Sequence, residues 1–230
     1  MKTIGLIGGM SWESSALYYQ LINEETKRRL GGHHNATSVM VTIDFAEVEH
    51  LQHAGDWDRL GVLLAESAQS LERAGADFVV LCTNTMHKLA EAITGSTKIP
   101  LLHIVDAMAK AIRVEGHQRV GLLATRFTME DAFYRDRLRN LFDIEAIVPG
   151  AESRELVHRV IYEELCHGVI RPESRAEYQG IIGNLHRAGA TAVILGCTEV
   201  ELLISQADSG LPVFPSTRLH AMAAVDLALS

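Results

Sequence analysis

"AGADFVVLCTNT" spans residues 74–85, and it decides the fold because the chain contains it twice. The near copy, "AGATAVILGCTE", spans residues 188–199. In both copies an Ala-Gly turn leads into a short apolar run, which is typical of a buried strand. In both copies the run ends in a cysteine followed by a threonine, at Cys82 and at Cys197. Two related strands therefore end in the same pair of residues.

The repeat extends beyond these two strands. Three segments match in the same order and at nearly one offset: 2–22 with 118–138, 74–85 with 188–199, and 99–112 with 211–225. The first pair aligns Tyr18 with Tyr134, which lies 116 positions later. Agreement of this kind indicates an internal duplication rather than a chance similarity.

Short apolar runs alternate with longer amphipathic segments in each half of the chain. In the first half we expect strands at 3–8, 38–45, 77–82 and 99–104, and helices at 11–30, 56–75, 83–93 and 105–116. Strands that alternate with helices predict βαβ units and a parallel sheet. We therefore predict an α/β fold of two pseudo-symmetric lobes, 1–116 and 117–230, each a mainly parallel sheet flanked by helices. The active site is expected in the cleft between the lobes, and the final helix is a candidate to pack on the first lobe.

Composition narrows the class of protein. The chain has 230 residues, of which 47% are hydrophobic, and its formal net charge of -8 argues against nucleic acid as a partner. The chain has three cysteines, which is a low number and an odd one, so it does not have the cysteine pattern of a disulfide scaffold. No apolar run approaches the roughly 20 residues of a membrane span, and the first one is too short for a signal peptide. We expect a cytoplasmic protein with no membrane partner.

The two cysteines predict a particular chemistry. Ligands of parallel sheets bind beyond the carboxyl ends of the strands, where Cys82 and Cys197 both fall. If the equivalent strand ends face one cleft, two thiols approach one substrate from opposite sides. One thiolate removes a proton from a carbon and one thiol returns a proton to the other face, which inverts the centre. A helix N-terminus after each cysteine is expected to lower the thiol pKa.

The neighbouring residues fit a small charged substrate. Thr83, Asn84, Thr85 and Thr198 carry uncharged hydrogen-bonding groups that could hold a carboxylate at a helix start. Glu199 could take an ammonium group. A single cysteine in an apolar strand is more often an inert core residue, but two in equivalent places favour a shared site. Cys166 has no such equivalent, and we interpret it as structural.

The motifs "GLIGGMSWES", "VLCTNTMHK" and "GCTE" resemble the aspartate/glutamate racemase family, and most closely its broad-specificity amino-acid racemase branch. The resemblance covers essentially the whole chain. It implies racemisation of free amino acids without pyridoxal phosphate or another cofactor, with Cys82 and Cys197 as the two acid/base groups. It also implies that the threonines and the asparagine beside them hold the substrate, and that the protein is a homodimer.

Two further positions enter only through this resemblance. Met10, in the turn after Gly8 and Gly9, matches the loop that approaches the substrate from the first strand. Gln52 falls where aspartate-specific members carry a basic clamp for the side chain. No arginine or lysine stands there, which leaves a neutral or longer amino acid open as the substrate.

Other features of the sequence are weaker indications of a functional site. "GLIGGM" lacks the spacing of a dinucleotide fingerprint. His50 and His53 lack a convincing third ligand, so we expect no metal site. His87 either tunes Cys82 or acts as a capping histidine, and Arg126 either reaches a substrate carboxylate or lies on the surface.

Two alternatives to a racemase stay open. One keeps the fold and uses a single cysteine as a nucleophile, as in related isomerases and decarboxylases, and would leave a covalent adduct. The other is a two-lobed amino-acid-binding sensor whose two thiols form a redox switch.

Overall fold

The computed structural model describes residues 1–230, which form two compact units. Unit 1 comprises Met1–Ile104 and His220–Ser230, and unit 2 comprises Val105–Leu219. The chain leaves unit 1 at the first residue of helix α5 (Ile104–Val114) and returns within helix α11 (Ser216–Leu229). The lobes 1–116 and 117–230 describe the duplicated stretch of sequence, and as domain boundaries they stay a prediction.

Unit 1 is built on a four-stranded parallel sheet with the strand order β2-β1-β3-β4. Its strands are β1 (Ile4–Gly8), β2 (Ser38–Thr42), β3 (Phe78–Leu81) and β4 (Leu101–Leu102). Its helices are α1 (Trp12–Leu30), α2 (Phe45–Ala54), α3 (Trp57–Arg73), the 3-10 helix η1 (Thr85–Leu89), α4 (Ala90–Ser96) and the second part of α11 (Ser216–Leu229).

Unit 2 repeats this topology, with a second four-stranded parallel sheet in the order β6-β5-β7-β8. Its strands are β5 (Arg119–Ala124), β6 (Glu145–Ile147), β7 (Ala192–Gly196) and β8 (Val213–Pro215). Its helices are α5 (Ile104–Val114), α6 (Arg126–Glu130), α7 (Ala132–Phe142), α8 (Ala151–Glu163), η2 (Leu165–His167), α9 (Pro172–Arg187), α10 (Val200–Leu203) and η3 (Gln206–Asp208). The predicted fold class, two parallel sheets flanked by helices, is confirmed.

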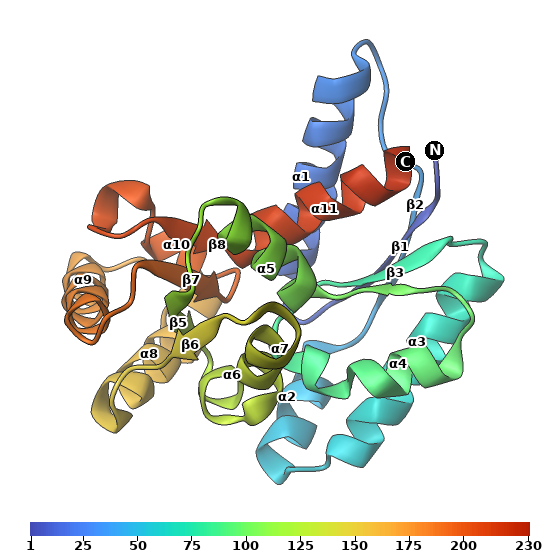
Figure 1. The fold of residues 1–230 in the computed structure, drawn as a ribbon. Coiled ribbons are helices and arrows are strands. Elements are labelled where there is room, and N and C mark those ends of the chain that lie inside the picture. The colour runs from blue at the N-terminus through green and yellow to red at the C-terminus, as the bar shows by residue number, and fades with distance from the viewer. The chain divides into compact units, whose positions relative to one another are not determined.

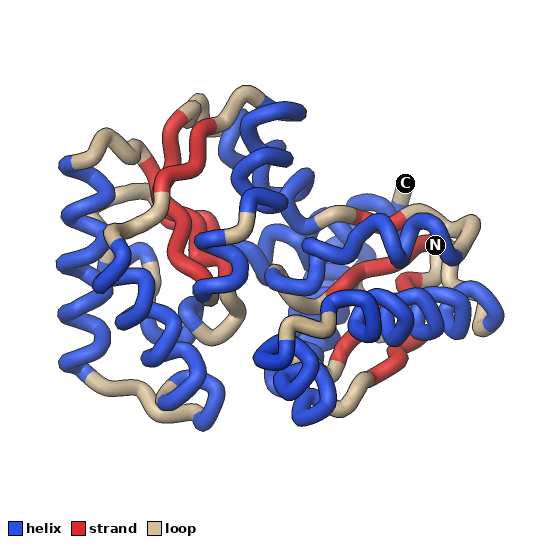
Figure 2. Tube along the Cα trace, turned by 90° about the horizontal axis from the view of Figure 1, so that it is seen from below, coloured by secondary structure: helices blue, strands red, loops and turns tan.

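Each sheet is covered by helices on both faces, as the strands and helices of Figure 2 show. In unit 1, alternate strand residues such as Ile4 and Leu6 pack with α1 and α11, whereas Ile7 and Leu81 pack with α3. Figure 1 shows α1 and α11 on one face of this sheet and α3 and α4 on the other. Because parallel strands are buried on both faces, they read as continuous apolar runs, which made them visible in the sequence.

The end of the chain is tied to unit 1 by a buried histidine. His220 is fully buried, and its Nδ1 lies 2.9 Å from the hydroxyl of Tyr18 on α1. Its Nε2 lies 2.9 Å from the carbonyl oxygen of Leu102 at the end of β4. Since the carbonyl can only accept, Nε2 carries the proton and Nδ1 accepts from the phenol. This neutral histidine joins α11, α1 and β4.

The segment that follows β3 differs from the prediction. A helix was expected over 83–93, but the chain first makes the 3-10 helix η1, and α4 begins only at Ala90. Asn84 stands at the N-terminal cap of η1 and makes no capping bond with its side chain. A polar segment directly after a buried strand therefore forms a tight turn before the regular helix begins.

Glycine at the same place in both central strands allows close packing against the residues around each strand. A Cβ built on Gly5 would lie 2.8 Å from the Cβ of Ala76 and 3.0 Å from the carbonyl oxygen of Phe78. A Cβ on Gly121 would lie 2.8 Å from the Cδ1 of Leu185. A methyl group on Gly5 would meet a backbone oxygen and a Cβ, which cannot move aside. A methyl group on Gly121 would meet the end of a flexible side chain.

We expect Gly5→Ala to lower the free energy of unfolding by about 1–3 kcal/mol, because the added methyl overpacks a rigid neighbourhood. Gly180→Ala is the matched control, since Gly180 lies in α9 with open space around it. That control is expected to stabilise the protein by about 0.5–1 kcal/mol through helix propensity. Urea unfolding followed by circular dichroism measures both, and equal stability of wild type and Gly5→Ala would contradict the packing.

Candidate active site

Cys82 lies directly after β3, at the carboxyl end of the unit 1 sheet. Its backbone N–H donates to the carbonyl oxygen of Ile7 over 2.9 Å, which continues the pairing between β3 and β1. Its carbonyl oxygen accepts from the Ser14 hydroxyl of α1 over 3.1 Å. Its thiol is fully buried and lies 3.9 Å from the carbonyl oxygen of Val80. The strand ladder and the first helix therefore fix the backbone that carries this thiol.

His87 holds the turn after Cys82. Its Nδ1 lies 2.7 Å from the carbonyl oxygen of Thr83, and its Nε2 lies 3.1 Å from the backbone nitrogen of Ile104. The carbonyl requires a proton on Nδ1, and the Ile104 N–H requires a lone pair on Nε2, so the ring is neutral. Ile104 is the residue at which the chain leaves unit 1. His87 thus ties the residue after the thiol to that crossing point.

Cys197 occupies the equivalent position in unit 2, directly after β7. Its Sγ donates to the Oε2 of Glu199 over 2.8 Å. The Thr198 hydroxyl lies 2.8 Å from the hydroxyl of Thr217 at the start of α11. A carboxylate in direct contact with the thiol gives Cys197 a proton acceptor of its own.

Burial raises the pKa of both thiols, which corrects the expected lowering by helix N-termini. Desolvation raises the pKa of Cys82. It also raises the pKa of Cys197, where the charge of Glu199 adds to the effect. The segments that follow, a 3-10 helix and the one-turn α10, are too short to supply a large dipole. Both thiols are therefore protonated at rest, and a thiolate formed at either would be a strong base.

The remaining predicted residues lie in the unit that their sequence position implies. Met10 packs in the apolar core of unit 1, and Gln52 of α2 is buried with its amide nitrogen 3.2 Å from the Met86 sulfur. Asn84 and Thr85 are buried in the same unit. Met10, Gln52, Cys82 and the segment 83–85 thus belong to unit 1, and Cys197 with its two neighbours belongs to unit 2.

Two residues outside the predicted site are also placed. Arg126 forms an ion pair with Glu155 of α8, with 3.5 Å between Nη1 and Oε2. Cys166 lies in η2, close enough to Cys197 that its charge contributes to raising the pKa of that thiol. No motif links these cysteines across the intervening residues, so their proximity could not be found from the sequence.

Sequence reasoning also missed three supporting contacts of the thiols. The Ser14 bond to Cys82 and the ring of His87 between Thr83 and Ile104 depend on tertiary packing. The contact of Glu199 with Cys197 is local, between residues two positions apart, and depends on the conformation of the turn after β7. The run of serines in "MSWESS" is the one signal that was available. There Ser11 caps α1, Ser14 bonds to Cys82, and Ser15 accepts from the N–H of Gly9 over 2.7 Å.

The structure also limits other kinds of site. No group of three or more histidine, cysteine, aspartate or glutamate side chains is arranged to hold a metal ion. None of the helices combines the length and the apolar composition that crossing a membrane requires.

A family model described as Asp/Glu/Hydantoin racemase matches residues 7–224. Among curated proteins, the broad specificity amino-acid racemase RacX of Bacillus subtilis is 22% identical over 235 residues, covering 99% of this chain and 98% of RacX. Among solved structures, a candidate Asp/Glu racemase from Yersinia pestis is 49% identical with a TM-score of 0.94, and an aspartate racemase homologue from Pyrococcus horikoshii OT3 is 33% identical with a TM-score of 0.85. Both structural matches cover 100% of each chain.

The carboxylate of Glu201 is expected to make stability depend on pH. Burial raises its pKa from 4.5 to about 7. It does so even though the carboxylate accepts a hydrogen bond from the Thr217 N–H over 2.8 Å, which lowers the pKa. Between these pH values the folded protein holds a proton that the unfolded chain has lost, so stability falls as pH rises through this window. Glu201→Gln keeps an acceptor oxygen and removes the titration. We expect the variant to be more stable than wild type at pH 8, by up to about 3 kcal/mol, and similar at pH 4.

Urea unfolding at both pH values checks this expectation. Glu177→Gln, at an exposed position of α9, is the matched control and should change stability little at either pH. A Glu201→Gln variant that is less stable than wild type at pH 8 would show that the ionised carboxylate stabilises the fold.

Proposed function

Because the chain belongs to the Asp/Glu/hydantoin racemase family, we propose that it racemises a free amino acid by a two-base mechanism. Cys82 and Cys197 act as paired proton donor and acceptor on opposite faces of Cα. The observation that supports this most strongly is that β3 and β7, equivalent strands of two sheets with the same topology, are both followed directly by Cys-Thr. A duplicated fold would retain the same reactive residue at both strand ends if each copy serves one face of the substrate.

The proton transfers balance with two thiols and no redox step. One cysteine, as its thiolate, takes the proton from Cα and becomes a thiol. The other cysteine, as a thiol, delivers a proton to the opposite face of the resulting carbanion and becomes a thiolate. The product is the enantiomer, and the two cysteines have exchanged roles.

Burial of the thiols suits this chemistry, because the proton on Cα is weakly acidic. A thiolate whose conjugate thiol has a raised pKa is a stronger base, and a site without water keeps it unsolvated. Both thiols are protonated at rest, so one proton has to leave before the reaction starts. Glu199 is the acceptor for it, since its Oε2 lies 2.8 Å from the Cys197 Sγ.

The neutral side chains beside the cysteines hold the substrate carboxylate in this proposal. The hydroxyl and amide groups of Thr83, Asn84, Thr85 and Thr198 stabilise the carboxylate and the negative charge that develops next to it. Thr83 is well suited to this role, because His87 fixes its carbonyl and with it the turn that carries its side chain. Pyridoxal phosphate is not required, because the substrate carboxylate and the polar turn share the charge.

The side chain of the substrate meets Gln52 rather than a basic residue. Gln52 is buried, and its side-chain amide nitrogen faces the Met86 sulfur. It therefore offers an acidic substrate side chain neither a positive charge nor the paired N–H donors of an arginine. We therefore propose a neutral or longer amino acid as the substrate. The broad specificity of RacX supports this choice. A homodimer and a cytoplasmic location stay predictions.

Replacing either active cysteine should separate the two half-reactions. In Cys82→Ser or Cys197→Ser, racemisation should fall by about 10³-fold or more, because one face loses its acid/base group. Each variant should still exchange the Cα proton of one enantiomer for deuterium with retention of configuration, and the two variants should favour opposite enantiomers. Proton NMR and chiral chromatography of single enantiomers in deuterated water measure exchange and inversion.

Cys166→Ser is the matched control for this experiment, since it removes a thiol of unit 2 that is not at a strand end. It should retain both exchange and inversion. A covalent adduct on one cysteine during turnover would instead support the nucleophilic alternative. Full activity of either strand-end variant would exclude the two-base mechanism.

Glu199→Gln tests the proton acceptor of Cys197. We expect kcat/KM to fall by about 10²-fold, because the thiolate of Cys197 then forms without an adjacent base. The fall is equal in both directions, since the enantiomers have equal free energy. The primary deuterium isotope effect should rise only for the enantiomer from which Cys197 takes the proton.

Glu201→Gln is the control from the same segment, because this carboxylate contacts the Thr217 backbone rather than the Cys197 thiol. It should leave kcat/KM near the wild-type value. Equal isotope effects for both enantiomers in Glu199→Gln would indicate that Glu199 acts on the substrate instead, for example by binding its ammonium group.

A further inference from the structure

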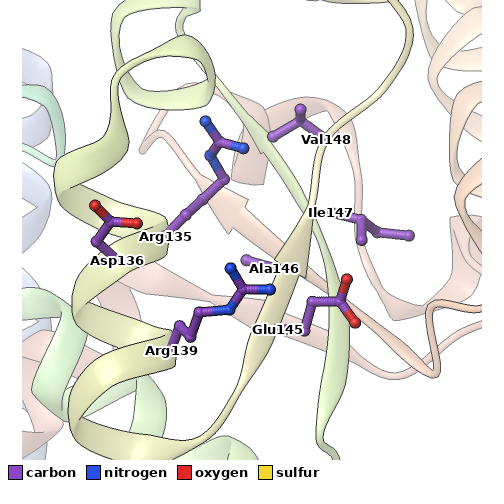
Figure 3. Close-up of a pocket in the computed structure, with 7 residues that line it drawn as sticks. All are labelled: Arg135, Asp136, Arg139, Glu145, Ala146, Ile147 and Val148. Atoms are coloured by element: carbon purple, nitrogen blue, oxygen red, sulfur yellow. The ribbon is translucent and has the colours of Figure 1, made fainter.

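A pocket in unit 2 lies apart from the residues of the candidate active site. It has a volume of about 360 Å³ and opens between α7 and the edge strand β6. Figure 3 shows the residues that line it, which are Arg135, Asp136, Arg139, Glu145, Ala146, Ile147 and Val148. None of them belongs to the proposed racemase site.

Two guanidinium groups enter this pocket without an acidic partner. Arg135 and Arg139 are one helical turn apart on α7, and both side chains extend toward β6 in Figure 3. Neither forms an ion pair, and in the figure the carboxylates of Asp136 and Glu145 point away from both guanidinium groups. Glu145 pairs instead with Arg119, at 3.4 Å. Two like charges at this spacing destabilise a helix unless something between them compensates.

The pocket also contains an unsatisfied donor. The Nε of Arg135 is buried and has no hydrogen-bond partner. Its Nη2 reaches only the carbonyl oxygen of Glu130, at 3.4 Å. A buried donor of a charged group without an acceptor is costly, so a movement of the Arg135 side chain that brings this atom to an acceptor in the pocket would be favourable.

The strand on the opposite wall adds a backbone donor. The Glu145 N–H donates to the Gln118 carbonyl oxygen over 2.8 Å, so this residue faces the neighbouring strand β5. Backbone groups alternate along a strand with a partner on one side only, so the N–H of Ala146 faces the open edge. The edge of a sheet with such free N–H groups is a site where anions bind.

We propose that this pocket binds an oxyanion, the phosphate or carboxylate group of a small molecule. The guanidinium groups of Arg135 and Arg139 would donate paired hydrogen bonds to the oxygens of the ligand, the geometry in which guanidinium binds both phosphate and carboxylate groups. The Arg135 Nε would gain its missing acceptor, and the Ala146 N–H would bond a further oxygen. The site is independent of the racemase proposal, because no residue is shared.

The test is a titration of the full-length, isotope-labelled protein with inorganic phosphate and, separately, with succinate at constant ionic strength. The backbone amide of Ala146, followed by ¹H–¹⁵N NMR, should shift and saturate with at least one of the two anions. Saturation with phosphate alone identifies a phosphoryl ligand, and saturation with succinate alone identifies a carboxylate ligand. Sodium chloride over the same range should give no saturable shift.

Arg135→Gln with Arg139→Gln should weaken the affinity by about tenfold or more, because each lost charge-assisted bond contributes to it. The single variant Arg139→Gln, at an exposed side chain, serves if the double variant does not fold. Arg159→Gln, an exposed arginine on α8 of the same unit, is the charge-matched control and should bind as wild type does. A non-saturating shift with both anions, or equal weakening in the control, would overturn the proposal.

Discussion

Parallel pairing of the central strands is the constraint on which the rest of the structure depends. In unit 1, β1 lies between β2 and β3, and in unit 2, β5 lies between β6 and β7. Parallel pairing puts the carboxyl ends of neighbouring strands at one edge of each sheet, so Cys82 and Cys197 emerge at equivalent places. It also requires helices on both faces of each sheet. Neighbouring atoms lie so close to the central strands that a Cβ on Gly5 or Gly121 would clash with them, which explains the glycines at these positions.

The same burial that makes the strands stable sets the chemistry of the thiols. Cys82 is fully buried and Cys197 is nearly so, which keeps both protonated until a base removes one proton. Only Cys197 has a carboxylate in contact, whereas the Cys82 thiol lies near a backbone carbonyl. The two strand ends are therefore alike in backbone position and differ in the group that lies beside each thiol.

Much of the fold could be predicted from the sequence, because buried parallel strands are continuous apolar runs and the repeat doubles the signal. The positions of Cys82 and Cys197 at strand ends followed from the same pattern. The direction of their pKa shifts could not be predicted from the sequence, because desolvation depends on the packing around the strand end. The ring of His87 between Thr83 and Ile104, and the two arginines opposite β6, likewise require tertiary structure.

In the proposed mechanism, the thiols of Cys82 and Cys197 both act on one substrate carbon. A crystal structure of the protein with a bound amino acid tests it most directly. We expect the Sγ atoms of Cys82 and Cys197 to lie within about 3.5 Å of Cα, on opposite sides of that carbon. A bound amino acid with only one sulfur near Cα, or with both sulfurs on the same side, would contradict it.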